Sequence, residues 1–155
     1  MLFCVDTSAL VEAWNTWYPP DVFPALWEEL GSESGPAELV SPAIVLDELR
    51  RKEDEIFKWS KNYVTFLELD AEVQLKQAEI VNRFPKLTEF RRGRSLADPW
   101  VVALAAIKRC PVVSMEKPGS TKNPRIPDVC SALKIEHLAF VEMLRRIRWE
   151  CQATA

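Results

Sequence analysis

Four acidic residues occupy positions where their neighbours give no reason for a negative charge. Asp6 directly follows the apolar run Leu2–Val5, Glu48 lies in the apolar stretch VLDEL, Asp98 begins DPWVVALAA, and Glu116 follows VVSM. Carboxylates that cluster repel one another, so at neutral pH they take up protons or are neutralised by a cation. An oxygen-only set without Cys or His favours a hard cation, Mg²⁺ or Mn²⁺, over zinc. If the fold brings these four side chains together, they predict a metal site.

Each of the four residues also has a purely structural explanation. An aspartate before a helix is often only its N-cap, which would account for Asp6 or Asp98. Glu48 could be a solvated helix residue like its neighbour Asp47, and Glu116 could simply begin a charged loop. The set of four is therefore more specific than any one member.

The elements that must position these residues alternate between strand and helix patterns. Leu2–Val5 is apolar on both faces, which is typical of a buried strand in a parallel sheet. Further strands are predicted at 39–41, 111–115 and 135–139, while 63–69 fits either a strand or a helix edge. The predicted helices follow Thr7 and Ser8 and cover 21–30, 42–52, 53–62, 72–84, 96–110, 128–133 and 140–149. This alternation predicts an α/β fold with a mostly parallel sheet.

A parallel sheet also predicts where the acidic residues meet. In such a sheet the ends of strands and the starts of the following helices lie at one edge, where ligands bind. Asp6, Asp98 and Glu116 are all at such ends, and Glu48 can reach the same edge from a flanking helix.

Length and composition predict one ordinary globular domain, which we expect to span residues 1–150 with a short tail at 151–155. Hydrophobic residues make up 48% of the 155 residues and charged residues 28%. The net charge of -3 gives no general argument for nucleic-acid binding, so any such function must depend on local basic clusters. No apolar run approaches the roughly 20 residues that span a bilayer. The four cysteines are scattered without a C-x-x-C pair, which favours reduced thiols in a cytoplasmic protein.

Four segments of the chain resemble a known family. VDTSAL, SPAIVLDEL, LADPWVVALAA and VVSMEK are similar, in order and in rough spacing, to the motifs of PIN-domain nucleases, including the VapC-type ribonuclease toxins. The first and third segments are the specific ones. The resemblance implies a three-layer α/β/α PIN-like domain and Mg²⁺- or Mn²⁺-dependent hydrolysis of RNA phosphodiester bonds. It also implies an antitoxin protein as partner, and a homodimer as an assembly common in that family.

The resemblance assigns roles to individual residues by position. It implies that Asp6, Glu48 and Asp98 are catalytic metal ligands and that Ser8 supports the site. The family's fourth acid is usually an aspartate, and here the nearest acid is Glu116. The segment after it, KPGSTKNPRIPDVCSAL, is longer and more basic than usual, which indicates a separate PIN-like branch and makes Asp128 a rival for the fourth acid.

Basic residues near Asp98 are the predicted substrate contacts. Arg91 and Arg92 in RRGR could deliver RNA phosphates to the acidic site, although a solvated surface is the commoner role of such a run. A phosphatase of the haloacid-dehalogenase type is disfavoured, because it needs a second aspartate at the position of Ser8. The remaining alternative is a catalytically inactive PIN-like module that binds RNA or protein. For the six tryptophans, core packing or a dimer face is favoured over base stacking.

Overall fold

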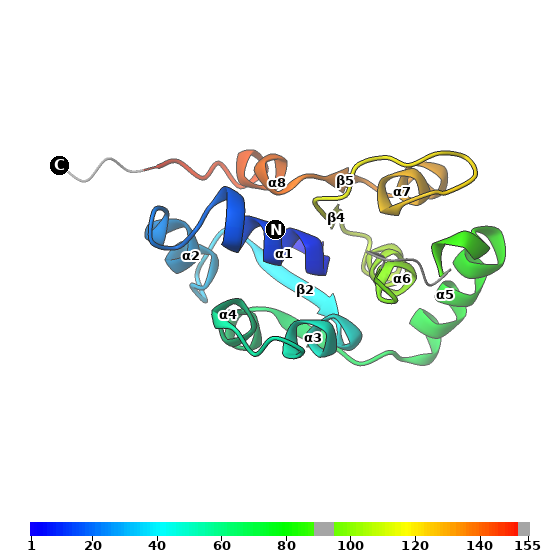
Figure 1. Ribbon diagram of the computed structural model, residues 1–155, viewed down its shortest axis with the longest axis horizontal. Coiled ribbons are helices and arrows are strands. Elements are labelled where there is room, and N and C mark those ends of the chain that lie inside the picture. The colour runs from blue at the N-terminus through cyan, green and yellow to red at the C-terminus, as the bar shows by residue number, and fades with distance from the viewer. Residues whose placement is uncertain (89–94, 152–155) are drawn as a thin grey trace.

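The computed structural model describes residues 1–88 and 95–151 as a sheet with helices on both faces (Figure 1). Strands and helices alternate along the chain, as the sequence predicts. The elements are β1 (Leu2–Val5), α1 (Thr7–Glu12), the π-helical turn η1 (Ala13–Trp17), α2 (Pro24–Leu30), β2 (Glu38–Pro42), α3 (Ala43–Arg50), α4 (Glu55–Tyr63), β3 (Thr65–Leu67), α5 (Ala71–Arg83), the 3₁₀ turn η2 (Pro85–Leu87), α6 (Asp98–Lys108), β4 (Val112–Val113), α7 (Ile126–Leu133), β5 (His137–Leu138) and α8 (Phe140–Arg146).

The five strands form one parallel sheet in the order β3-β2-β1-β4-β5. The chain therefore builds the sheet outward from β1 through β2 to β3 and then returns to the other side of β1 to add β4 and β5. The direction reverses between β1 and β4, and ligands of open α/β sheets bind outside the carboxyl ends of strands at such a point. Asp6 follows β1, and Ser114 follows β4.

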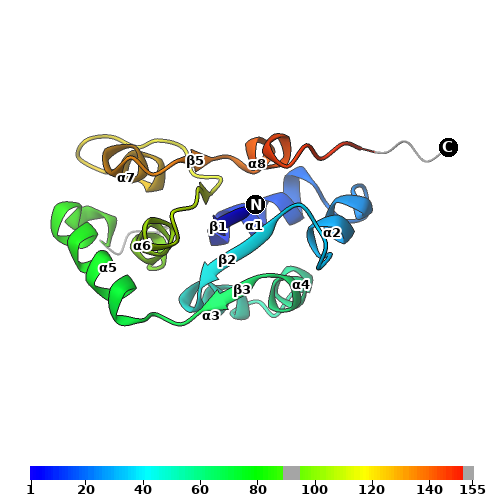
Figure 2. The same cartoon turned by 180° about the vertical axis from the view of Figure 1, so that it is seen from behind.

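The helices lie in two layers. Figures 1 and 2 show α5, α6 and α7 grouped together on one side, and α1 to α4 with α8 on the other. Helix α6 packs on β1, β2 and β4 and against α5. The ring centroids of Tyr18 and Phe140 lie 5.5 Å apart, so the start of α8 packs against the end of η1. The three-layer α/β/α fold predicted from the sequence is confirmed.

Helix α6 is the central helix of its layer because almost every face of it is apolar. Val101, Val102, Ala103 and Leu104 are all buried. Burial of each Val or Leu side chain stabilises the fold by about 1.5–3 kcal/mol relative to exposure. The helix ends where Arg109 adopts a left-handed conformation, with φ of 53°. This packing fixes the start of α6, and hence Asp98, against the sheet.

Three tryptophans form an aromatic cluster on the opposite layer. The ring centroids of Trp14 and Trp27 are 4.7 Å apart, and those of Trp27 and Trp59 are 4.9 Å apart. The indole N–H of Trp27 donates to the Tyr18 carbonyl at 2.7 Å, so this buried polar group is paired. Core packing is thus confirmed for this cluster, whereas Trp17 is 58% exposed.

Several element boundaries differ from the sequence prediction. The last helix ends at Arg146 rather than 149, because the chain turns and Arg148 has a positive φ of 58°. Helix α2 begins at Pro24 rather than 21, after the loop that contains Pro19 and Pro20. The ambiguous segment 63–69 contains strand β3, Thr65–Leu67.

Two further sequence expectations concern membranes and thiols. Over residues 1–88 and 95–151, no helix has the length and apolar character needed to cross a bilayer. Cys4, Cys110 and Cys130 are buried free thiols, and Cys151 is an exposed one. Burial raises the pKa of Cys130 to about 12, so this thiol stays protonated.

Candidate active site

Asp6 is fixed at the end of β1 by backbone and side-chain hydrogen bonds. Its N–H donates to the Val113 carbonyl of β4 at 2.9 Å. Its Oδ2 accepts from the Ser8 N–H at 3.0 Å and from the Ser8 hydroxyl at 2.6 Å, which makes Asp6 the N-cap of α1. The Ser8 hydroxyl in turn accepts from the Met115 N–H at 3.1 Å. Ser8 therefore holds Asp6 and joins the ends of β1 and β4, consistent with a supporting role.

The capping role of Asp6 uses only one of its two oxygens. Its Oδ1 is buried and has no hydrogen-bond partner in the described chain, and the residue is only 2% exposed. A buried carboxylate oxygen normally has a partner, because leaving it unpaired costs free energy. Helix capping alone therefore does not explain Asp6.

Asp98 is the first residue of α6, directly followed by Pro99. The N-cap position belongs to Ala97, so the interpretation of Asp98 as a plain N-cap is wrong. Asp98 is 2% exposed, and its Oδ1 is a second buried carboxylate oxygen without a partner among the described residues. Among the described residues, the start of α6 thus presents a buried carboxylate oxygen that lacks a hydrogen-bond partner, as Asp6 does.

Glu48 is held between the starts of two other helices. Its Oε2 accepts from the Thr7 hydroxyl and its Oε1 from the Ser95 hydroxyl, each at 2.5 Å. Ser95 also accepts from the Ala97 N–H at 3.0 Å. By contrast, the side chain of Asp47, the residue before Glu48, is 68% exposed. The solvated-helix explanation therefore fits Asp47 and not Glu48, whose partners adjoin Asp6 and Asp98.

The two rivals for the fourth acid have different surroundings. Glu116 has an 11% exposed side chain; its Oε2 accepts from the Ile126 N–H at 3.1 Å, and its Oε1 lies 3.6 Å from Arg125 Nη1. Asp128 instead accepts from the N–H groups of Gly119 and Arg125 through one oxygen, at 2.7 and 2.8 Å. Asp128 thus organises the loop before α7, and Glu116 is the acid that faces the other three.

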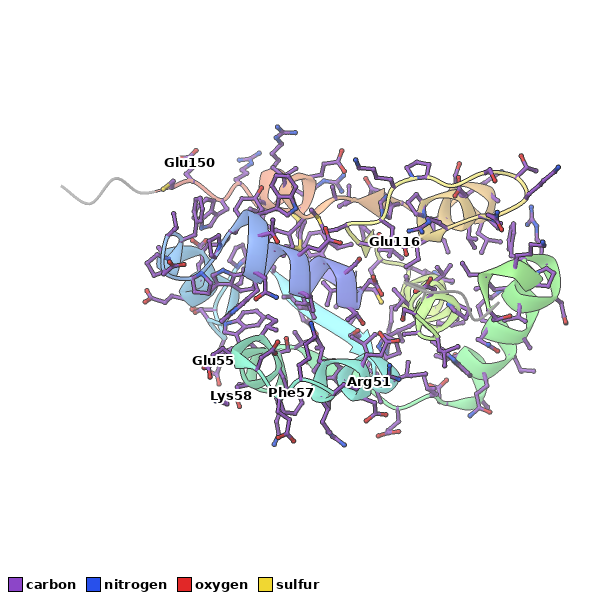
Figure 3. All side chains as sticks on the ribbon, in the orientation of Figure 1. Arg51, Glu55, Phe57, Lys58, Glu116 and Glu150 are labelled. Atoms are coloured by element: carbon purple, nitrogen blue, oxygen red, sulfur yellow. The ribbon has the colours of Figure 1, made fainter. Side chains whose placement is uncertain are left out.

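The four acids line one cavity of about 340 Å³, together with Thr7, Ser8 and Ser95. Arg51 and Lys52 line its rim. Figure 3 shows Glu116 and Arg51 on opposite sides of the α1 ribbon. The buried part of the lining is therefore acidic and suited to a cation, whereas its more exposed part is of mixed charge, with Arg51 and Lys52 beside Glu12 and Asp54.

Burial and mutual repulsion raise the pKa values of the two innermost acids. The pKa of Asp98 rises from 3.8 to about 9, first through burial and then through the charges of Asp6, Glu116 and Glu48. The pKa of Asp6 rises to about 6, again mainly through burial, although its hydrogen bonds to Ser8 act in the opposite direction. Without a cation, the site therefore holds at least one extra proton at neutral pH, on Asp98.

The donor set fits a hard divalent cation in its chemistry. Among the described residues, Asp6 and Asp98 each present a buried oxygen without a hydrogen-bond partner, whereas both oxygens of Glu48 and Oε2 of Glu116 already accept hydrogen bonds. Across 1–88 and 95–151, no group of three Asp, Glu, His or Cys side chains is already arranged to hold a metal ion. Asp6 and Asp98 are thus the candidates for direct ligands, and Glu48 and Glu116 for contacts through water.

Some site residues were not singled out from the sequence. Thr7 and Ser95 fix Glu48, and their closeness to Asp6 and Asp98 in the sequence was the available signal. Arg51 and Lys52 belong to a basic cluster of the sequence, Arg50–Lys52, and lie directly after the end of α3 at Arg50. The predicted substrate contacts Arg91 and Arg92 lie outside the described residues.

Comparisons with known proteins give a family and a fold. The model of a family described as a domain of unknown function, DUF4411, matches residues 3–151. No curated protein matches the chain. Among solved structures, VapBC-1 from nontypeable Haemophilus influenzae is similar at 14% identity, with a TM-score of 0.59 over 91% of this chain and 99% of that one.

Two other structures give the same result. VapBC2 from Rickettsia felis, bound to a promoter DNA fragment, has 14% identity and a TM-score of 0.56 over 90% of this chain and 98% of that one. FitAcB from Neisseria gonorrhoeae has 16% identity and a TM-score of 0.51 over 90% and 98%. At such identities the likeness concerns the fold alone, and the expected likeness to the PIN-type fold of VapC proteins is confirmed.

Proposed function

We propose that this chain, which belongs to the DUF4411 family, is a metal-dependent endoribonuclease that hydrolyses phosphodiester bonds in RNA. The observation that carries the proposal is the pair of buried oxygens on Asp6 and Asp98 that have no hydrogen-bond partner within 1–88 and 95–151, in one cavity with Glu48 and Glu116. A purely structural site would have no reason to keep repelling acids with unsatisfied oxygens.

In this proposal Asp6 and Asp98 hold Mg²⁺ or Mn²⁺, and Glu48 and Glu116 complete its surroundings. Such an ion, when bound, lowers the pKa of an attacking water and offsets the charge that develops on the phosphate. As the water oxygen bonds to phosphorus, the bond from phosphorus to the leaving ester oxygen breaks; one of the two glutamates accepts the water's proton, and the leaving oxygen takes a proton from solvent. Thr7 and Ser95 keep Glu48 oriented for this task.

Two exposed cations in the cavity lining supply positive charge for RNA. Arg51 and Lys52 border the buried acidic part of the lining, so they can contact the phosphates on either side of the cleaved bond. Arg91 and Arg92 remain proposed contacts from just before the site.

The biological role that we propose is that of a cytoplasmic toxin silenced by an antitoxin protein. The likeness to VapBC structures supports a partner of this kind. Exposed apolar residues in the helix-rich half, Trp17 and Val22, at 58% and 62% exposure, are the proposed docking surface. A homodimer is a second proposed assembly.

Metal-dependent cleavage of RNA is the test. We expect the wild-type protein to cut single-stranded RNA with Mn²⁺ or Mg²⁺ and to stop when a chelator is added. Asp6→Asn and Asp98→Asn should each lower the rate by more than the roughly 10- to 100-fold typical of losing a residue that only supports a ligand. Circular dichroism should show that the fold is intact.

A matched control lies next to the site. Asp47→Asn removes the same charge from an exposed position adjacent to Glu48 and should leave the rate unchanged, whereas Glu48→Gln should lower it. RNA binding without cleavage under every metal condition would instead favour the inactive binding module. Cleavage by Asp6→Asn at the wild-type rate would refute the proposed site.

A further inference from the structure

The loop 117–125, between β4 and α7, is held in a defined conformation by hydrogen bonds. Asp128 accepts from the N–H groups of Gly119 and Arg125 and thereby draws the two ends of the loop together. Between these ends, Ser120 and Asn123 pair through both backbone groups, at 3.2 and 3.0 Å. A Cβ at Gly119 would lie 2.2 Å from the Asn123 carbonyl oxygen, so the close approach requires glycine. The loop 117–125 therefore has a defined shape.

One end of this loop lies at the acidic cavity. Glu116 precedes the loop, and Arg125 at its far end lies 3.6 Å from the Glu116 carboxylate. Figures 1 and 2 show the loop, in yellow, extending from β4 past α7 toward the end of α5. The loop thus reaches from the proposed active site to a different part of the surface.

The middle of the loop borders a second cavity of about 260 Å³. Its lining is formed by the loop and by the end of α5 with the turn η2: Arg83, Phe84, Pro85, Lys86, Thr121, Lys122 and Pro124. Three of these residues are basic and none is acidic, although the whole chain has a net charge of -3. The Arg83 guanidinium lies over the Phe84 ring, 5.1 Å from its centroid, which orders this cation.

We propose that the loop 117–125 and the end of α5 form a binding groove for the phosphate backbone of RNA, leading away from the acidic cavity. This inference rests on the proposed function, since it places RNA in that cavity. Arg125 receives the strand beside Glu116, and Lys122 and Arg83 bind phosphates farther along it. Phe84, partly buried against the core, holds the Arg83 guanidinium over its ring at this end of the groove.

The concentration of cations in one groove explains how an acidic protein can hold a polyanion. Repulsion by distant acidic groups is screened beyond about 8–10 Å in physiological salt, so the local charge governs binding. Each phosphate neutralised by a basic side chain releases counterions, which makes binding depend on salt concentration. We therefore expect the phosphate contacts in the groove to account for a measurable part of the salt dependence of RNA affinity.

The test is the salt dependence of RNA binding by Arg83→Ala/Lys122→Ala. Affinity for a fluorescent single-stranded RNA is measured in EDTA, which prevents cleavage, over a series of salt concentrations. Loss of two phosphate contacts should reduce the slope of log K against log salt by about 1.4, at about 0.7 per contact on single strands. The control Lys61→Ala/Arg145→Ala removes the same charge from exposed sites outside the groove and should leave the slope at the wild-type value.

A second measurement separates this inference from the proposed function. Hydrolysis of a small phosphodiester such as bis(p-nitrophenyl) phosphate, with Mn²⁺, requires the acidic cavity but not the groove. The groove variant should keep this activity while cutting RNA more slowly than wild type. An unchanged slope, or equal loss in the control variant, would overturn the groove even if RNA is cleaved. If no phosphodiester is hydrolysed at all, the proposed function fails, while the slope measured in EDTA still decides the groove.

Discussion

Asp98→Asn should have opposite effects on cleavage and on the stability of the metal-free protein. Between pH 5 and pH 8 the folded protein keeps Asp98 protonated, because its pKa is about 9, whereas the unfolded chain has the ordinary pKa of 3.8 and is ionised. The folded state then binds one proton more than the unfolded state. The free energy of unfolding therefore falls by about 1.36 kcal/mol per pH unit, or about 4 kcal/mol over this range.

Asparagine carries no charge at any pH, so the variant should lose this slope while keeping nearly the same shape. Asp6 adds its own loss of stability, which is complete once the pH exceeds its folded pKa of about 6. Above that pH, the remaining decline in the wild-type protein should come from Asp98. A change of about 4 kcal/mol is a large part of the 5–15 kcal/mol typical of a whole domain.

Urea unfolding in EDTA at several pH values measures the effect. We expect the wild-type protein to become less stable from pH 5 to pH 8, with Asp98→Asn nearly flat above pH 6 and Asp47→Asn parallel to wild type. Addition of Mn²⁺ at 100 times its dissociation constant should restore about 2.7 kcal/mol to wild type at pH 8 and nothing to Asp98→Asn. A wild-type stability that stays level across this range, or an Asn variant with the wild-type slope, would refute the reasoning.

Four other substitutions test separate parts of the structure. Ser8→Ala should lower stability by about 1–3 kcal/mol and reduce cleavage, because it removes the hydroxyl that donates to the buried Asp6 and accepts from the Met115 N–H; thermal unfolding and an RNA assay measure both. Glu116→Gln should reduce hydrolysis of a small phosphodiester, whereas Asp128→Asn should retain it, and the reverse result would make Asp128 the fourth acid. Trp27→Ala should cost about 3–5 kcal/mol of unfolding free energy, seen in urea titration, because it empties the centre of the aromatic cluster.

The sequence by itself determined the type of fold and the positions of the acids along the chain. The run Leu2–Val5 is apolar on both faces and the segment that forms α6 is apolar on almost every face, so both are stable only when buried. Alternation of strands with helices then required a parallel sheet, whose strand ends share one edge. For this reason Asp6 and Asp98 could be expected at a common crevice before any coordinates were known.

Only the tertiary structure decided what each acid contacts. Whether Glu48 faces solvent or Thr7 and Ser95 depends on how α3 packs against α1 and the start of α6, which local spacing does not encode. The choice between Glu116 and Asp128 depends on the path of a nine-residue loop, 117–125, closed by contacts between its two ends. Hydrogen bonds and buried charges act over a few ångströms in three dimensions, whereas hydrophobic periodicity is a property of the chain, so the fold was predictable and the partners were not.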